Sequence, residues 1–362
     1  MNSRERVLAV LAGDLPDRCP IDFQCTGPMR KRLIDDIGLA DNEALLRHFG
    51  SDIRTVGAGR KPHYIDGYYS HLFTHQLDED TYVDNWGVTW RRAPMPSGDT
   101  FYDVIGSPLA DAVNVSHIEA HAFPSPAEDW DYSGIRQRAE QHEGYAIAGG
   151  TSAVFDDAWR LLGFENLLLA MHTKPGLVDA ALRKVCDYWL EHARLTLEAA
   201  GGAIDLMWTK DDLGTQNGLL MSPSACRRFV TPLIKERADL FHQYGAGVMM
   251  HCCGGIGPIV GDLVEAGVQV LNPIQSAAHG MDRAALKDTY GDRLAFHGSV
   301  DQQRVLVPGT PDDVVRETKE CIDVLGRGGG YIVASSHELE ADIPVENVKA
   351  MFLTAQEYGR YA

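Results

Sequence analysis

The sequence predicts a mixed α/β protein of the (β/α)8 TIM-barrel class, and three observations support this. From residue 145 onward, short apolar runs alternate with amphipathic stretches of helical length. Such alternation implies parallel strands joined by right-handed crossovers through helices. The chain has 362 residues, enough for one large barrel, a fold that commonly exceeds about 250 residues. No glycine fingerprint for a dinucleotide follows any apolar run, which disfavours the main alternative, a doubly wound sheet.

The expected elements follow in chain order. A helix over residues 3–12 leads into a first strand at 19–23, and a further strand is expected near Ile53 or in the region after it. Six more strands are expected at residues 145–148, 205–209, 247–251, 268–272, 294–298 and 331–334. Amphipathic helices are expected at residues 175–199, 222–244, 258–266 and 311–325. About eight strands result, the number that closes a barrel.

Residues 60–140 interrupt this rhythm. They are rich in Tyr, Trp, His, Pro and Asp and show little sustained periodicity, apart from short strand-like runs such as residues 82–90. We expect this segment to be an insertion or cap within a single domain that spans residues 1–362. Because barrel active sites lie at the carboxyl ends of the strands, the cap would cover that mouth.

The charge and the cysteines narrow the class of protein. Lysine and arginine minus aspartate and glutamate give a formal net charge of −18, which argues against nucleic acid or an anionic membrane as partner. Seven cysteines without framework spacing are typical of a reducing compartment. We find no segment with the length and apolarity of a signal peptide or membrane span. The sequence therefore predicts a cytoplasmic protein.

The most informative motif is Gly-Val-Met-Met-His-Cys-Cys-Gly-Gly-Ile-Gly at residues 247–257. Successive strand residues point to opposite faces, so His251 and Cys253 share a face while Cys252 points away. An imidazole beside a thiolate offers two ligands of the kind that zinc prefers. Zinc would also keep a thiol deprotonated at neutral pH. Alternatively the cysteines are small buried packing residues, because free cysteine is among the most buried residue types.

Polar residues follow several other predicted strands, and in a barrel they would converge on one pocket. Asp211 and Asp212 are adjacent and point oppositely, so we expect one of them, Asp211, to face the pocket as a catalytic carboxylate. The structural alternative is a helix N-cap, a common position for aspartate. Gln275, after its strand, and Trp86, in the cap, are expected to contact substrate. Each has an alternative role, Gln275 as a structural polar group and Trp86 as a residue that holds the cap together.

Four stretches of the chain resemble one known superfamily. They are the opening Arg-Glu-Arg-Val to Asp-Arg-Cys-Pro at residues 4–20, the Asp-Asn-Trp-Gly-Val-Thr-Trp segment at 84–90, Asp-Asp-Leu-Gly-Thr-Gln-Asn-Gly at 211–218, and the closing Gly-Gly-Gly-Tyr-Ile-Val-Ala-Ser-Ser-His-Glu run that extends over 328–347. In these stretches the chain resembles the uroporphyrinogen decarboxylase superfamily, and within it the cobamide-dependent methyltransferase branch of the methylcobamide:coenzyme M type.

This resemblance implies a distorted TIM barrel with its site at the carboxyl ends of the strands. In the methyltransferase branch, a His-x-Cys pair and a cysteine of the closing motif bind zinc. His251 and Cys253 match the first two positions, and His337 stands where those enzymes have cysteine. The implied set is therefore zinc held by His251, Cys253 and His337, a competent combination of ligands. The cobamide, or corrinoid, would be carried by a separate small protein.

The resemblance leaves a second reaction class open. The decarboxylases themselves carry a histidine in the closing motif, so His337 would then contact substrate in a lyase without metal, together with Asp211. Their N-terminal cationic loop is not matched, since residues 24–30 here read Gln-Cys-Thr-Gly-Pro-Met-Arg. A third possibility is a barrel that binds a small molecule without catalysis. The sequence favours a zinc-dependent methyltransferase that acts in corrinoid-linked methyl transfer or in demethylation of a small methylated compound.

Overall fold

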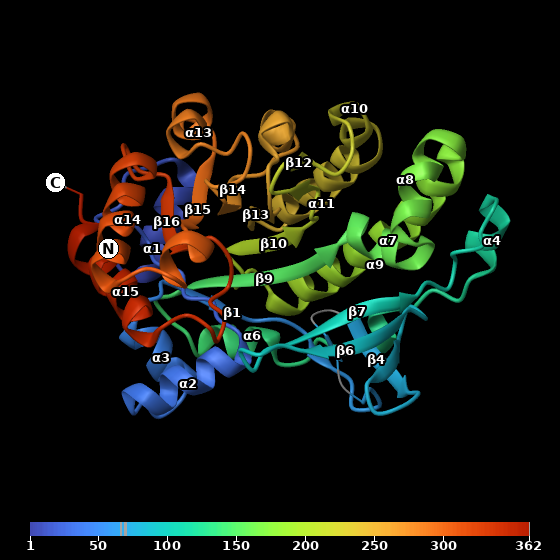
Figure 1. Cartoon of the computed structure of the whole chain (residues 1–362), viewed down its shortest axis with the longest axis horizontal. Helices are drawn as coiled ribbons and strands as arrows, with labels where there is room; N and C mark the ends of the chain where they lie inside the picture. Colours follow the sequence, from blue (N-terminus) through green and yellow to red (C-terminus); the bar gives the residue numbers. More distant parts are fainter. Residues whose placement is uncertain (66, 69–70, 362) are drawn as a thin grey trace.

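Seven parallel strands form the central curled sheet of the computed structural model, which describes residues 1–65, 67–68 and 71–361. Their order is β1-β9-β10-β13-β14-β15-β16 (Figure 1). The strands are β1 (Ile53–Thr55), β9 (Ala146–Ala153), β10 (Leu206–Lys210), β13 (Gly247–His251), β14 (Val270–Ile274), β15 (Ala295–Val300) and β16 (Tyr331–Ser335). Nearly all of their residues are buried, as expected for a parallel sheet covered by helices.

The segment around Ile21 takes the eighth position between β16 and β1. Ile21 forms a parallel bridge with Val333 of β16. On its other side, the Ile21 carbonyl accepts a hydrogen bond of 2.7 Å from the amide of Asp52, next to β1. The predicted first strand is therefore reduced to one bridged residue. The architecture is a distorted (β/α)8 barrel, as the sequence predicts.

Helices pack around the outside of the sheet and supply the crossovers. The N-terminal helices are α1 (Ser3–Ala12), α2 (Gly27–Ile37) and α3 (Asn42–His48). The later helices are α7 (Val154–Leu162), α8 (Phe164–Thr173), α9 (Pro175–Ala200), α10 (Pro223–Ala225), α11 (Thr231–Gln243), α12 (Val260–Glu265), α13 (Arg283–Tyr290), α14 (Pro311–Leu325) and α15 (Val345–Tyr358). Among the described residues, none of the helices has the length and apolarity to span a membrane.

Helix α1 closes the amino-terminal end of the barrel. Val10 of α1 clusters with one residue from each of five strands, namely Leu206, Met249, Val270, Ala295 and Ile332. Val7 packs in the same way against β1 and β9. Because side chains alternate along a strand, residues two positions further along face the same interior. The amino-terminal end of the interior is therefore an apolar floor, and the residues two positions further along each strand face the same interior toward the carboxyl end.

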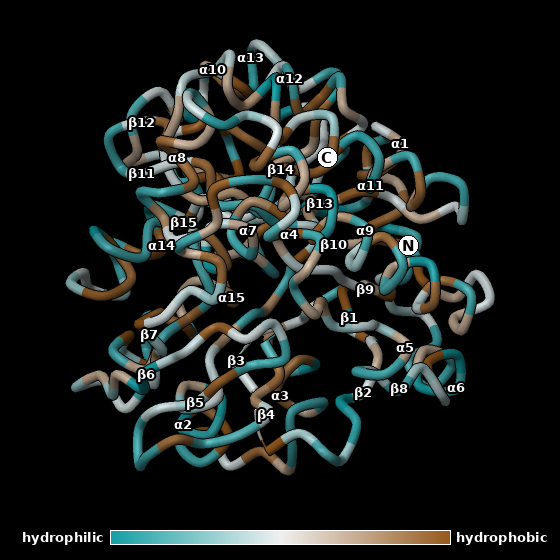
Figure 2. Tube along the Cα trace, turned by 90° about the vertical axis from the view of Figure 1, so that its right-hand side faces the viewer, coloured by the Kyte–Doolittle hydropathy of each residue, from teal (hydrophilic) through white to brown (hydrophobic). Residues whose placement is uncertain are grey.

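Residues 67–68 and 71–106 contain a separate five-stranded antiparallel sheet in the order β3-β4-β5-β6-β7. Its strands are β3 (Gly67–Tyr68), β4 (His71–Gln76), β5 (Thr81–Asp84), β6 (Thr89–Pro94) and β7 (Thr100–Gly106). Figure 2 shows this sheet on the opposite side of the molecule from α10, α12 and α13. Short elements complete the region and the loops: α4 (Val115–Ala120), α5 (Pro126–Asp129), α6 (Ile135–Glu140), the pair β2 (Gly59–Arg60) and β8 (Trp130–Asp131), and the hairpin β11 (Gly214–Thr215) and β12 (Gly218–Leu219). That this region serves as a cap in a single-domain protein stays a prediction.

Several element predictions are confirmed and others are wrong in detail. The helix over residues 3–12 is confirmed as α1, where Asn2 and Glu5 form a reciprocal capping box. The single strand expected at 82–90 is two strands, because Gly87 adopts a positive φ of 83° in the turn between them. The helix expected at 222–244 is interrupted by a π-helical turn at Cys226–Val230. Helices α7 and α8 were not expected.

Candidate functional site

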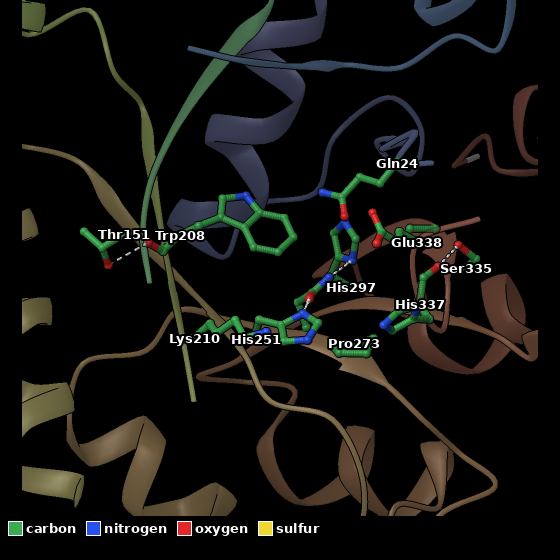
Figure 3. Close-up of a pocket in the computed structure, with 12 residues that line it drawn as sticks. Gln24, Thr151, Trp208, Lys210, His251, Pro273, His297, Ser335, His337 and Glu338 are labelled. Carbon is green, nitrogen blue, oxygen red and sulfur yellow. Dashed lines mark hydrogen bonds between the residues drawn. The ribbon is translucent and has the colours of Figure 1, made fainter. Parts of the chain in front are cut away.

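The interior side chains of five strands line a pocket at the carboxyl end of the barrel (Figure 3). Two residues above the apolar floor, the strands present Trp208, His251, Asn272, His297 and Ala334. Lys210 lies two residues after Trp208 in β10 and also lines the pocket. The wall is completed by the loop residues Gln24, His337 and Glu338, by Ser335 at the end of β16, and by Thr151 and Pro273. The predicted convergence of polar strand ends on one pocket therefore holds for His251 and His337.

A chain of hydrogen bonds fixes the ring of His251. His251 Nδ1 lies 2.7 Å from Asn272 Oδ1, and Asn272 Nδ2 lies 2.5 Å from His297 Nδ1. His297 Nε2 lies 3.0 Å from a carboxylate oxygen of Asp22. Since that carboxylate and the amide oxygen accept, the chain is satisfied when each histidine donates toward Asp22 or Asn272. His251 then keeps its proton on Nδ1 and presents the lone pair of Nε2 to the pocket.

The Nε2 atom of His251 meets two further metal-ligating groups. Cys253 Sγ lies 3.3 Å from it and Asp212 Oδ1 lies 3.7 Å from it. The ligand atoms of Asp212, His251 and Cys253 all lie within 4.8 Å of one another. The Cys253 amide also donates a hydrogen bond of 3.2 Å to Asp212 Oδ1, which holds the loop after β13 against the loop after β10. Imidazole nitrogen, thiolate sulfur and carboxylate oxygen are all zinc ligands, so these three residues fit the ion.

Burial governs the protonation of two members of this group. It lowers the pKa of His251 to about 4, so the imidazole is neutral at pH 7. It raises the pKa of the Cys253 thiol to about 12, with the Asp212 carboxylate acting in the same direction. A neutral imidazole is the form that binds metal, whereas the thiol needs a nearby cation to lose its proton.

Lys210 and Asp156 add two further charged groups beside Asp212. Burial opposes the charge of Lys210, but the carboxylates of Asp212 and Asp156 outweigh it and raise the pKa of the lysine. Its Nζ lies 3.3 Å from Asp212 Oδ2. Burial raises the pKa of Asp156 to about 7, so this carboxyl is partly protonated near neutral pH. The site therefore holds a lysine cation in contact with Asp212, and a carboxyl that is partly protonated near neutral pH influences it electrostatically.

His337 lies across the pocket from His251, with 6.5 Å between the ring centroids. Its Nδ1 is 3.3 Å from Glu340 Oε1, and this hydrogen bond raises the pKa of His337. His337 is therefore held by Glu340 and is not part of the compact group of Asp212, His251 and Cys253. The adjacent Cys252 is fully buried, and its Sγ accepts a hydrogen bond of 3.4 Å from the amide of Leu213.

Three of the residues expected from sequence lie elsewhere. Asp211 is fully buried behind β10, where it pairs with Arg237 at 2.5 Å and accepts from the amide of Phe155 at 2.6 Å. Trp86 is 1% exposed and packs against aromatic residues of α9. Gln275 accepts a hydrogen bond of 2.6 Å from the amide of Gly254 and so holds the glycine loop. The structure therefore contradicts the expectation that the Asp211 carboxylate faces the pocket. It gives Trp86 and Gln275 structural contacts, and their expected contact with substrate stays a prediction.

The sequence reasoning missed Asp22, Trp208 and the role of Asp212. Lys210 pairs in register with His251, so these two residues share the interior face, and Asp212 follows two positions later. That register was the missing information, because the sequence alone did not say which of the two adjacent aspartates shares the face of His251. No signal in the sequence pointed to Asp22, whose side chain meets His297 only after the barrel closes.

Comparison with known proteins defines the class to which this fold and site belong. The uroporphyrinogen decarboxylase (URO-D) family pattern matches residues 106–358, and the chain belongs to this family. The resemblance drawn from the sequence motifs is therefore confirmed.

Individual relatives include both kinds of enzyme. A methylated-thiol–coenzyme M methyltransferase of Methanosarcina mazei is 23% identical over 57% of this chain and 52% of its own length. The match thus spans about half the length of that relative. A uroporphyrinogen decarboxylase of Coxiella burnetii is 23% identical over 77% of this chain and 75% of its own length. The structure of a methyltransferase from Methanosarcina mazei superposes with a TM-score of 0.72 at 21% identity, with 99% of both chains covered, which shows the shared fold.

Proposed function

We propose that this protein is a zinc-dependent methyltransferase that acts in corrinoid-linked methyl transfer or in demethylation of a small methylated compound. The observation that carries the proposal is the compact group of Asp212, His251 and Cys253 at the carboxyl end of the barrel. Its nitrogen, sulfur and oxygen donors suit zinc. The similarity to a methylated-thiol–coenzyme M methyltransferase supports methyl transfer as the reaction class.

The proposed metal site uses His251 and Cys253 as two ligands, as the sequence predicts, and adds Asp212 as the third. His337 faces the same pocket and remains the proposed fourth group, either as a ligand after its side chain turns from Glu340 or as a contact to substrate. Zinc would supply Lewis acidity, which lowers the pKa of a bound thiol or polarises the heteroatom that carries the methyl group.

The protein's own residues then divide the remaining tasks. Asn272, His297 and Asp22 hold His251 in the tautomer that leaves Nε2 free. Trp208 stacks near His251, with ring centroids 6.3 Å apart, and walls the pocket. When the methyl carbon separates from its heteroatom, that atom keeps the electron pair and takes up a proton. Lys210 lines the pocket, and we propose it as the group that supplies or relays this proton.

The corrinoid is expected on a partner protein. The pocket has a volume of about 200 Å³, which suits a small substrate and not a macrocycle of the corrin type with its side chains. A separate carrier would present the cobalt at the mouth of the barrel. The corrinoid carrier expected from the sequence is therefore part of this proposal.

The alternative is a uroporphyrinogen decarboxylase-like lyase without metal. The decarboxylases of Coxiella burnetii match a longer part of the chain than the methyltransferase does. A substrate with many carboxylates requires a concentrated cationic clamp. Of the described residues that line the pocket, Lys210 is the one lysine or arginine. The site geometry therefore favours methyl transfer.

Metal analysis tests the proposal. Protein purified without chelator is expected to contain about one zinc per chain. Removal of the zinc should abolish methyl transfer from methylated thiols or methyl ethers to reduced cobalamin, and zinc should restore it. Full activity in protein that holds no metal would overturn the proposal, and release of CO2 from a polycarboxylate by that same protein would establish the lyase.

A further inference from the structure

A second cavity lies between the barrel and the antiparallel sheet, next to the pocket of the metal-ligating group. It has a volume of about 450 Å³, and Thr151 and Lys210 line both cavities. This volume is within the usual range of small-molecule sites, which is roughly 300 to 1,000 Å³. We call it the inner chamber. A ligand in the inner chamber could therefore extend one end past Lys210 toward His251.

Aromatic rings from four different elements wall the inner chamber. They are Tyr68 of β3, Trp90 of β6, Trp130 of β8 and Trp189 of α9. Tyr68 and Trp90 meet edge to face, with centroids 5.8 Å apart. Such walls bind flat apolar bodies through stacking and edge contacts. The chamber is thus shaped for a substrate with a planar ring.

The charge of the lining is the second feature. Of the described residues that line the chamber, Arg160 and Lys210 are cationic and none is acidic. The carboxylate of Asp157 lies behind Arg160 and accepts from its Nη1 at 2.7 Å. Arg160 Nε is buried and has no hydrogen-bond partner among the described residues. Arg160 lines the chamber and its side chain is 17% exposed, so it can contact an anion bound there.

We propose that the inner chamber binds an aromatic carboxylate that carries a methyl group on oxygen, with the ring between the aromatic walls and the carboxylate on Arg160. This proposal rests on the proposed methyl transfer for the fate of the methyl group. Arg160 and Lys210 line the chamber, whereas the carboxylates that pair with them, Asp157 and Asp212, are not among the lining residues. This lining favours an anion over a quaternary ammonium, which aromatic walls alone would also accept. The methyl-bearing end would reach the metal-facing pocket past Thr151 and Lys210.

Calorimetric titration with 3-methoxybenzoate tests the proposal directly. 3-Methylanisole has the same shape without the charge, and glycine betaine is the quaternary ammonium probe. We expect 3-methoxybenzoate to bind at least tenfold more tightly than either. Equal binding of the neutral compound, or tighter binding of glycine betaine, would overturn the proposal.

Variants locate the site. Arg160→Gln should weaken binding of 3-methoxybenzoate on the order of tenfold to a hundredfold, because it removes a charge-assisted contact. The matched control is Arg228→Gln, an exposed arginine paired with Asp179 on the outer surface, which should leave binding unchanged. Equal affinities of these two variants would overturn the proposal.

A second variant decides the matter if Arg160→Gln does not fold. Gly57 lines the chamber, and a Cβ added there meets no atom within 4 Å. Gly57→Phe should therefore fill the chamber and abolish binding, and retained affinity would place the ligand elsewhere.

The titration is repeated on the Cys253→Ser variant, in which binding should persist without zinc. Binding with no methyl transfer would then contradict the proposed function alone, whereas zinc and methyl transfer from other donors with no binding would contradict the chamber alone.

Discussion

The two faces of the strand ends at β10 and β13 carry the same residue types in opposite environments. On the inner face, Asp212 and Cys253 meet His251 and form the metal-ligating group. On the outer face, Asp211 is paired with Arg237 of α11, and Cys252 accepts from the amide of Leu213. Asp211 and Asp212 are adjacent in the sequence, and so are Cys252 and Cys253. The comparison shows that chemical type alone does not identify a site residue, because strand alternation assigns one aspartate and one cysteine to the pocket and their neighbours to the packing.

The largest expected effect separates the two cysteines. Cys253→Ser should remove most of the bound zinc, since it deletes a ligand. Cys252→Ser should leave the zinc content nearly unchanged, because its Sγ is turned toward Leu213. Metal content per chain, measured by mass spectrometry on both purified variants, checks this. Equal retention in the two variants would contradict the assignment of the faces.

The two aspartates should separate by stability. Asp211→Asn breaks a fully buried ion pair and leaves Arg237 uncompensated, which costs about 3 to 5 kcal/mol. Asp212→Asn affects a carboxylate that is 36% exposed, so we expect a change in unfolding free energy of less than about 1 kcal/mol together with weaker metal binding. Urea unfolding of the metal-free proteins measures the first difference. A larger loss of stability in Asp212→Asn would reverse the assignment.

The hydrogen-bond chain behind His251 provides a third comparison. Asn272→Leu removes the acceptor that fixes Nδ1 and should weaken zinc binding about tenfold to a hundredfold. Asn347→Leu is the control, because the Asn347 amide donates to the carbonyls of Leu306 and Gly309, which lie between β15 and α14 and do not line the pocket. It should alter stability but not zinc affinity. Competition with a fluorescent chelator measures the affinity of both.

The sequence predicted the parts of this molecule that depend on local pattern. Apolar runs gave the barrel strands, and alternation within one strand placed His251 and Cys253 together with Cys252 behind them. The choice of Asp211 over Asp212 went wrong because it depends on the register between β10 and β13, where Lys210 lies opposite His251. The sequence could not show that Trp86 packs on α9, because this is a tertiary contact between segments far apart in the chain. We therefore expected Trp86 at the substrate. The region of residues 60–140 lacks periodicity, so its five-stranded sheet could not be derived from pattern.

The smallest expected effect concerns His337, where this chain departs from the cysteine of the resembling methyltransferases. Its ring lies 6.5 Å from that of His251 and is held by Glu340, so it stands at the edge of the metal-ligating group. If it completes the zinc site, His337→Ala should weaken zinc binding several-fold, whereas His337→Cys should keep the zinc and some transfer to a thiol. A histidine in place of a cysteinate leaves one thiolate in the ligand set where the resembling enzymes have two, which makes the zinc a harder Lewis acid and favours a bound ether over a thiolate. Zinc content that is indifferent to both substitutions would show that His337 is not a ligand, and the demethylation of an ether would then lose its main support from the ligand set.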